Sequence, residues 1–81
     1  MKTLENKFTY NDKEEYWTSN KTYFGLSPSE DSKLIVSLCD DFSSIYYKSK
    51  NGREIIIFDS PRGIKDEKEL KTVFKLLDIK L

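Results

Sequence analysis

Two runs of strand-forming residues on either side of Asn51-Gly52 constrain this chain more than any other feature. The stretch Ile45–Phe58 reads IYYKSKNGREIIIF. Asn-Gly is the strongest short signal for a two-residue hairpin turn, because both turn positions need positive φ. We therefore predict antiparallel strands at Ile45–Lys50 and Arg53–Phe58. In this register Lys50 lies opposite Arg53, Tyr47 opposite Ile56, and Ile45 opposite Phe58.

The predicted register gives the hairpin two different faces. One face carries Ile45, Tyr47, Ile56 and Phe58. The other face carries Tyr46, Lys48, Ile55 and Ile57. Because the second strand is apolar on both faces, we expect it to lie centrally in a sheet, with a helix, other strands or another molecule over each side.

The segment before this hairpin carries a helix-capping signature. Ser27-Pro28-Ser29-Glu30 combines an N-cap serine, a proline at the first helical position and a glutamate three residues after the cap. Apolar residues then recur at helical spacing, at Leu34, Ile35, Leu38 and Phe42. The pattern predicts a helix over Pro28–Phe42. A buried strand over Leu34–Cys39 is the alternative.

A second capping signature follows the hairpin. Asp66 occupies the cap position and Glu69 lies three residues later. The apolar stripe that follows consists of Leu70, Val73, Phe74 and Leu77. We therefore predict a helix over Asp66–Ile79.

The N-terminal segment is richer in aromatic residues. Residues 1–6 are polar, and we expect them to be frayed. Lys7–Tyr10 and Glu15–Thr18 flank a turn-like stretch, residues 11–14, which predicts a hairpin with Phe8 opposite Trp17. Lys21–Gly25 is a third short strand. The mixture of acids, lysines and aromatics also suits a helix, so that alternative stays open.

Together these segments predict one small α+β domain of 81 residues in the order β-β-(β)-α-β-β-α. We expect a small antiparallel sheet with two helices packed on one face. The pattern leaves open whether the N-terminal aromatic segment covers the sheet or extends it.

The residue types present argue against catalysis and against bound metal. The chain has no histidine and a single cysteine, Cys39, so an internal disulfide and the usual Cys/His zinc sites are excluded. We therefore expect a non-enzyme with no cofactor. No stretch approaches the roughly 20 apolar residues of a membrane span. The polar start also lacks the apolar core of a secretory signal, so we expect a cytoplasmic protein.

The aromatic content favours protein binding. Five tyrosines, five phenylalanines and one tryptophan are too many for two short helices to cover, and such side chains are common at interface hot spots. The occupant is expected to be another protein or a second copy. The expected contact residues are Tyr16, Trp17, Tyr46, Lys48, Ile55 and Ile57. The lysine-, isoleucine- and asparagine-rich usage is typical of AT-rich bacteria and their phages, which suggests an inhibitor or adaptor that blocks a larger host protein.

Nucleic-acid binding is the alternative function. The basic side chains that would serve it lie at the hairpin tip and on the C-terminal helix. They are Lys48, Lys50, Arg53, Lys68, Lys71 and Lys75. However, 14 basic residues balance 14 acidic ones, so the chain lacks the strong positive charge of most nucleic-acid-binding domains.

Overall fold

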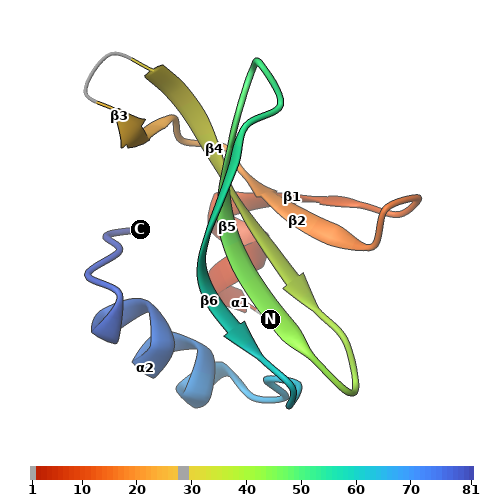
Figure 1. Cartoon of the computed structure of the whole chain (residues 1–81). Coiled ribbons are helices and arrows are strands. Elements are labelled where there is room, and N and C mark those ends of the chain that lie inside the picture. Colours follow the sequence, from red (N-terminus) through yellow and green to blue (C-terminus); the bar gives the residue numbers. More distant parts are fainter. Residues whose placement is uncertain (1, 28–29) are drawn as a thin grey trace.

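The computed structural model of the chain describes the backbone of residues 2–27 and 30–81, and the side chains of all of these except 25–27. Within these residues the chain forms one antiparallel sheet of six strands and two helices (Figure 1). The elements in order are α1 (Lys2–Lys7), β1 (Phe8–Asn11), β2 (Tyr16–Ser19), β3 (Tyr23–Ser27), β4 (Glu30–Leu38), β5 (Ser43–Ser49), β6 (Glu54–Ser60) and α2 (Glu67–Leu76).

The predicted hairpin around Asn51-Gly52 is present as β5 and β6, but the prediction of a two-residue turn is wrong. Ser49 N–H donates to the Arg53 carbonyl at 2.9 Å, so the loop has three residues, 50–52. Gly52 takes the one positive φ of this loop, at 85°. Three-residue hairpin loops place a single residue in this conformation, so Gly52 alone satisfies the turn.

The longer loop moves the register near the hairpin tip by one residue. Tyr47 pairs with Ile55, and Tyr46 pairs with Ile56. A bulge at residue 57 then restores the predicted pairing of Ile45 with Phe58. Because side chains alternate along a strand, the slip exchanges the faces of Ile55 and Ile56.

The predicted helix over Pro28–Phe42 is wrong for the described residues. The alternative, a buried strand over Leu34–Cys39, gives the correct type of element with different bounds. Residues 30–38 form β4, which pairs with β5 along its length and with β2 and β3 on its other edge. Leu34, Ile35 and Val36 are all buried, as expected for a central strand with neighbours on both edges. Glu30 makes no capping box here, because its carboxylate binds Arg53 at 2.7 Å. Pro28 and Ser29 lie outside the described residues.

The predicted N-terminal hairpin is present as β1 and β2, with a register two residues from the prediction. Phe8 pairs with Ser19, and Tyr10 pairs with Trp17. The Asn11 side chain explains the shift, since it accepts hydrogen bonds from the main-chain N–H groups of Lys13 and Glu14, both at 3.0 Å. Asn11 therefore starts the turn from the last strand position.

The N-terminal strands extend the sheet. The strand order is β1-β2-β4-β5-β6, with β3 also paired to β4. The second strand of the predicted hairpin, β6, therefore lies at the edge of the sheet, and the prediction that it lies centrally is wrong. Ser19 joins these strands, because its buried hydroxyl donates to the Lys21 carbonyl at 2.7 Å and accepts from Leu34 N–H at 2.9 Å. Figure 1 shows the β1–β2 hairpin reaching sideways from the twisted β4–β5–β6 part of the sheet.

The two helices contribute to one hydrophobic core. The predicted cap of α2 is confirmed, since Glu69 N–H donates to the Asp66 carboxylate at 2.7 Å. Residues 1–6 were expected to be frayed and Lys7 to begin a strand, but Lys2–Lys7 form α1, in which Leu4 is fully buried. Thr3 N–H also donates to the Glu67 carboxylate at 2.7 Å, which ties α1 to α2. The core cluster consists of Leu4, Phe8, Leu34, Val36, Ile45, Ile64, Leu70, Val73, Phe74 and Ile79.

The α+β class and the antiparallel sheet are therefore as predicted, while the element order is not. The observed order is α-β-β-β-β-β-β-α. One predicted helix is a central strand, and the helix at the start of the chain was not predicted.

Candidate protein-binding surface

The side of the sheet that faces away from the core cluster carries a continuous set of side chains, which we call the open face. Leu34, Val36 and Ile45 point into the core, so the intervening Ile35 and its partner Tyr46 point the other way. The same register places six further residues beside them. The open face consists of Tyr16, Thr18, Lys33, Ile35, Tyr46, Lys48, Glu54 and Ile56.

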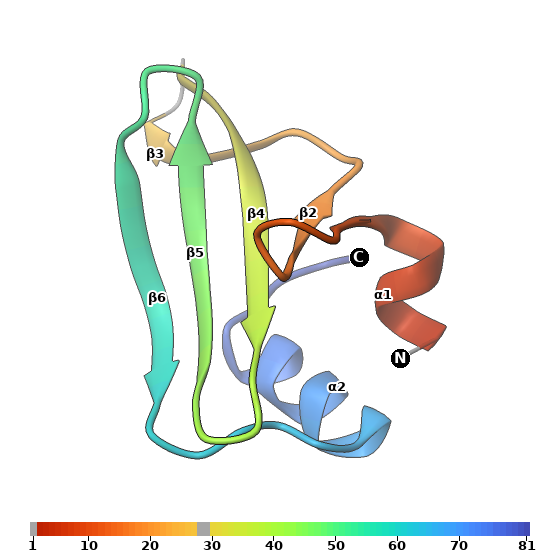
Figure 2. The same cartoon turned by 90° about the vertical axis from the view of Figure 1, so that its right-hand side faces the viewer.

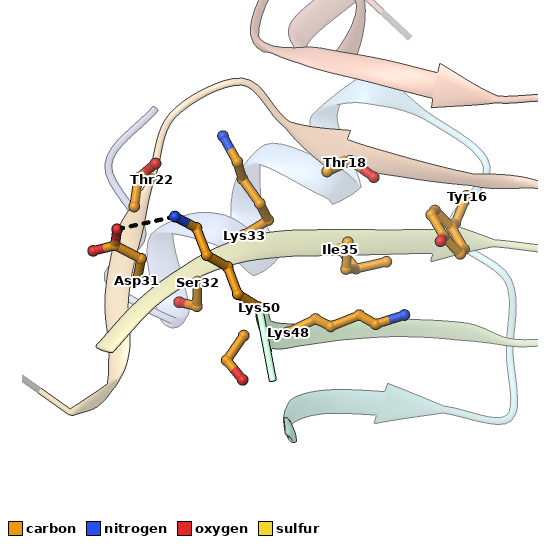
Figure 3. A pocket seen from close by; sticks show the side chains of 10 residues that line it. Tyr16, Thr18, Thr22, Asp31, Ser32, Lys33, Ile35, Lys48 and Lys50 are labelled. Carbon is orange, nitrogen blue, oxygen red and sulfur yellow. Dashed lines mark ion pairs between the residues drawn. The ribbon is translucent and has the colours of Figure 1, made fainter. Parts of the chain in front are cut away.

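A shallow groove of about 230 Å³ lies on the open face over β4 (Figure 3). Ile35 lies in the groove and is only 3% exposed, because the side chains around it shelter it from solvent. Figure 3 shows the Lys48 side chain extended along β5 toward Tyr16. The aliphatic part of this lysine thus covers apolar surface while its charge stays near solvent.

The groove has an apolar centre and charged margins. The Lys33 ammonium donates to the Asn20 carbonyl at 3.0 Å. Lys50 lies 3.8 Å from the Asp31 carboxylate, and Lys48 lies 3.9 Å from that of Glu54. These long, exposed pairs contribute little to stability.

Tyr46 lies next to this groove in a partly buried position. Burial raises the pKa of its phenol above the usual value, and Glu54, Tyr16 and Glu14 act in the same direction. The neutral form is therefore favoured, and Tyr46 offers a neutral amphipathic ring at physiological pH.

The structure brings three of the six expected contact residues together. Tyr16, Tyr46 and Lys48 share the open face. Trp17 lies on the opposite side, where it packs against the core and its ring lies 4.9 Å from that of Tyr10. The remaining two do not join the open face. Ile55 pairs with Tyr47 on the core side, and Ile57 lies at the bulge and packs against the core.

Five open-face residues were not among the expected contacts, and the two apolar ones among them are Ile35 and Ile56. Ile35 was assigned to a helix, so no sheet face was expected at that position. Ile56 was placed on the wrong side by the one-residue slip, and it is 60% exposed. Assuming a three-residue hairpin loop would have placed Ile56 correctly. Such loops, with glycine at the position of positive φ, are the commonest type after two-residue loops.

The basic residues at the hairpin tip are accompanied by acids. The ion pairs are Lys48 with Glu54, Lys50 with Asp31, and Arg53 with Glu30. The expected basic tip is therefore largely neutralised by acids of β4 and β6. This arrangement reduces its attraction for phosphate.

The lysines of α2 form a separate exposed stripe. Lys68, Lys71 and Lys75 are all exposed, and none takes part in an ion pair among the described residues. Figure 1 shows α2 near the opposite end of the molecule from the β5–β6 loop. The two basic clusters proposed from the sequence thus do not combine into one surface.

Within residues 2–27 and 30–81, no group of three or more His, Cys, Asp or Glu side chains is arranged to hold a metal ion. Cys39 is a half-buried free thiol just after β4. Neither of the described helices is long and apolar enough to cross a membrane.

Comparison of the chain with protein-family models, with curated protein sequences and with solved structures gives no match in any of the three.

Proposed function

We propose that this protein acts by binding another protein through the open face of its sheet, with no catalysis of its own. Ile56 carries this proposal. It is a β-branched apolar side chain, 60% exposed, and it lies beside the partly buried ring of Tyr46. Exposed apolar residues are common singly, but Ile56 adjoins Tyr46, which in turn adjoins Ile35 in the groove, and such contiguous apolar surface favours a docking role.

The composition of the open face supports this role. Its centre is apolar or aromatic, with Ile35, Tyr46 and Ile56, and Lys33, Lys48 and Glu54 lie around it. Protein interfaces commonly combine a buried apolar or aromatic centre with a polar rim. Tyrosine is also enriched at hot spots because it supplies a large contact area at low entropic cost.

We also propose how this protein acts on its partner. We expect a cytoplasmic inhibitor or adaptor of phage or mobile-element type that blocks a larger host protein. In this arrangement α1 and α2 would both support the sheet from the side of Leu34, Val36 and Ile45, which leaves the open face for the partner. A stoichiometric blocker needs a stable surface and no reactive group, which suits the residues available.

Nucleic-acid binding has weaker support. Three of its six proposed residues are paired with acids at the hairpin tip. The lysines of α2 form a short stripe on a chain whose net charge is zero. We therefore propose a protein, and not a nucleic acid, as the partner.

The test uses the immobilised protein as bait in a lysate of the source cell, with quantitative mass spectrometry as the readout. Ile56→Lys places a charge in the centre of the open face. We expect it to reduce capture of the specific partner by at least about tenfold, since hot-spot substitutions commonly exceed 1.4 kcal/mol.

Leu76→Lys is the matched control, because Leu76 is 81% exposed on α2 and away from the open face. This variant should retain capture. Both variants should keep the circular-dichroism melt of the parent chain. If every captured protein is held equally by both variants, binding through the open face is refuted.

A further inference from the structure

Strand β6 is the open edge of the sheet, and its composition is unusual for such a position. Its one strand partner among the described elements is β5, and Figure 2 shows it along the margin of the sheet. Glu54–Ser60 reads EIIIFDS, with four consecutive apolar residues and neither lysine nor proline. Natural edge strands are usually protected by charges, proline or shortness, whereas β6 has the bulge at residue 57 and an acid on each side of an uncharged apolar run.

The hydrogen-bond pattern identifies the main-chain groups that face outward. The Arg53 carbonyl accepts from Ser49 N–H, so Arg53 directs its main-chain groups toward β5. Along a strand, successive residues direct their main-chain N–H and C=O groups alternately toward one neighbouring strand and toward the other. Glu54 and Ile56 therefore direct their N–H and C=O groups away from β5, where an added strand would meet them.

The side chains along the same edge form an acid–apolar–acid pattern. In the strand register Glu54 lies opposite Lys48, Ile56 opposite Tyr46, and Asp59 opposite Ser44, which places Asp59 on the same side of the sheet as the open-face residues Glu54 and Ile56. Asp59 is exposed, and within the described part of the chain it takes part in no ion pair. A complementary strand would carry a basic, an apolar and a basic side chain on that face.

We propose that β6 accepts an added strand from the partner protein, an extended segment in which basic residues flank a β-branched apolar residue. The proposal rests on the proposed function and names the chemistry of the partner. Main-chain hydrogen bonds to Glu54 and Ile56 would supply affinity, while the flanking charges would supply selectivity. On the other side of the added strand, apolar side chains would contact the exposed edge of Ile55.

A second copy of the chain fits this edge less well. Antiparallel pairing of β6 with itself would bring two acid–apolar–acid patterns together, and like charges on adjacent strands are destabilising. No lysine or arginine lies within Glu54–Ser60 to compensate for this repulsion. Charge complementarity thus favours a basic partner strand.

The test uses two synthetic peptides, acetyl-TKVIVKT-amide and its charge-reversed control acetyl-TEVIVET-amide. In antiparallel pairing the isoleucine opposes Ile56 and one lysine opposes Glu54. The other lysine opposes Asp59 when bulge residue 57 is left unpaired, as it is against β5. NMR titration of the labelled full chain at low salt should show shifts centred on β6 for the basic peptide. Amide exchange at Glu54 and Ile56 should slow at least about tenfold in the complex, because these N–H groups become hydrogen-bonded. The acidic peptide should bind at least about tenfold more weakly.

Peptide N-methylation separates strand addition from a charge effect without altering the protein. A methyl group on the isoleucine nitrogen blocks the N–H that faces β6, so binding should fall at least about tenfold. A methyl group on the first valine nitrogen points away and should have a small effect. Equal losses, equal binding of both charge variants, or shifts centred elsewhere would each overturn the proposal.

A further outcome is self-association. A dimer that protects the same two amides, measured by sedimentation and hydrogen exchange, would assign the edge to a second copy and also refute the proposed partner chemistry. If the peptides fail but Ile56→Lys still loses its captured protein, strand addition is refuted and the proposed function stands.

Discussion

Leu4→Ala tests the element that the sequence did not predict. Leu4 is fully buried in the core cluster, although α1 has only six residues. A helix this short is not stable alone, so it depends on packing. The apolar contacts of Leu4 are therefore expected to hold α1 against the rest of the domain.

The expected loss of stability follows from this burial. Truncating a fully buried leucine to alanine costs about 3 kcal/mol or more, through lost transfer free energy and the cavity that remains. For 81 residues the unfolding entropy near the melting temperature is about 170 cal/mol/K, so the melting temperature should fall by about 18 °C. A core of this size supplies only about 3–5 kcal/mol in total, so the variant should be close to unfolding at 37 °C.

The assay is thermal and urea unfolding followed by far-ultraviolet circular dichroism. Leu76→Ala is the matched control, because the same substitution at a position 81% exposed should change stability by less than about 0.5 kcal/mol. A Leu4→Ala melting temperature within about 3 °C of the parent would refute the packing of α1 and return residues 1–6 to a frayed terminus.

Two further predictions concern buried polar groups. Ser19→Ala removes the acceptor of the buried Leu34 N–H, so urea unfolding should show a loss of about 1–3 kcal/mol, and a loss below about 0.5 kcal/mol would contradict this bond. At high pH, three tyrosines should titrate late, because burial raises the pKa of each phenol and so favours its neutral form. They are Tyr23, Tyr46 and Tyr47. Their contribution to stability should be complete below the unfolded-state pKa of about 10 and decline as pH rises beyond it. Absorbance at 295 nm checks the titration and circular dichroism the unfolding. Tyrosines that all ionise together near pH 10 in the folded protein would refute the prediction.

The elements predicted correctly are those with local signals. The cap of α2 needs only Asp66, whose carboxylate accepts a hydrogen bond from the main-chain N–H of Glu69 three residues later, whatever packs above them. The hairpin needs only strand-forming residues around a glycine. Both depend on contacts within a few residues, and both are present.

The elements predicted wrongly have ambiguous local signals. Leu34, Ile35 and Leu38 fit a helical stripe and also a strand buried on both faces. Pairing with its sequence neighbours β3 and β5, and with the more distant β2, favours the strand. Tertiary packing therefore overrode the capping signature.

In the candidate site, too, some residues were placed correctly from the sequence and others were not. Tyr16, Tyr46 and Lys48 were placed on one surface because their strands were correctly identified. Ile56 was missed because one extra loop residue reverses the faces of the next strand until the bulge corrects the register.

Residue types and short spacings were sufficient to indicate a small antiparallel α+β domain, a Gly52-containing hairpin and a capped C-terminal helix. Contacts between distant segments decide three other features. They make residues 30–38 extended, they hold residues 2–7 as the helix α1, and they leave Ile56 exposed. Local hydrogen bonds act over a few residues and can be recognised in the chain. Strand register and burial arise when distant segments pack together, and here they place the apolar edge of β6 at the surface.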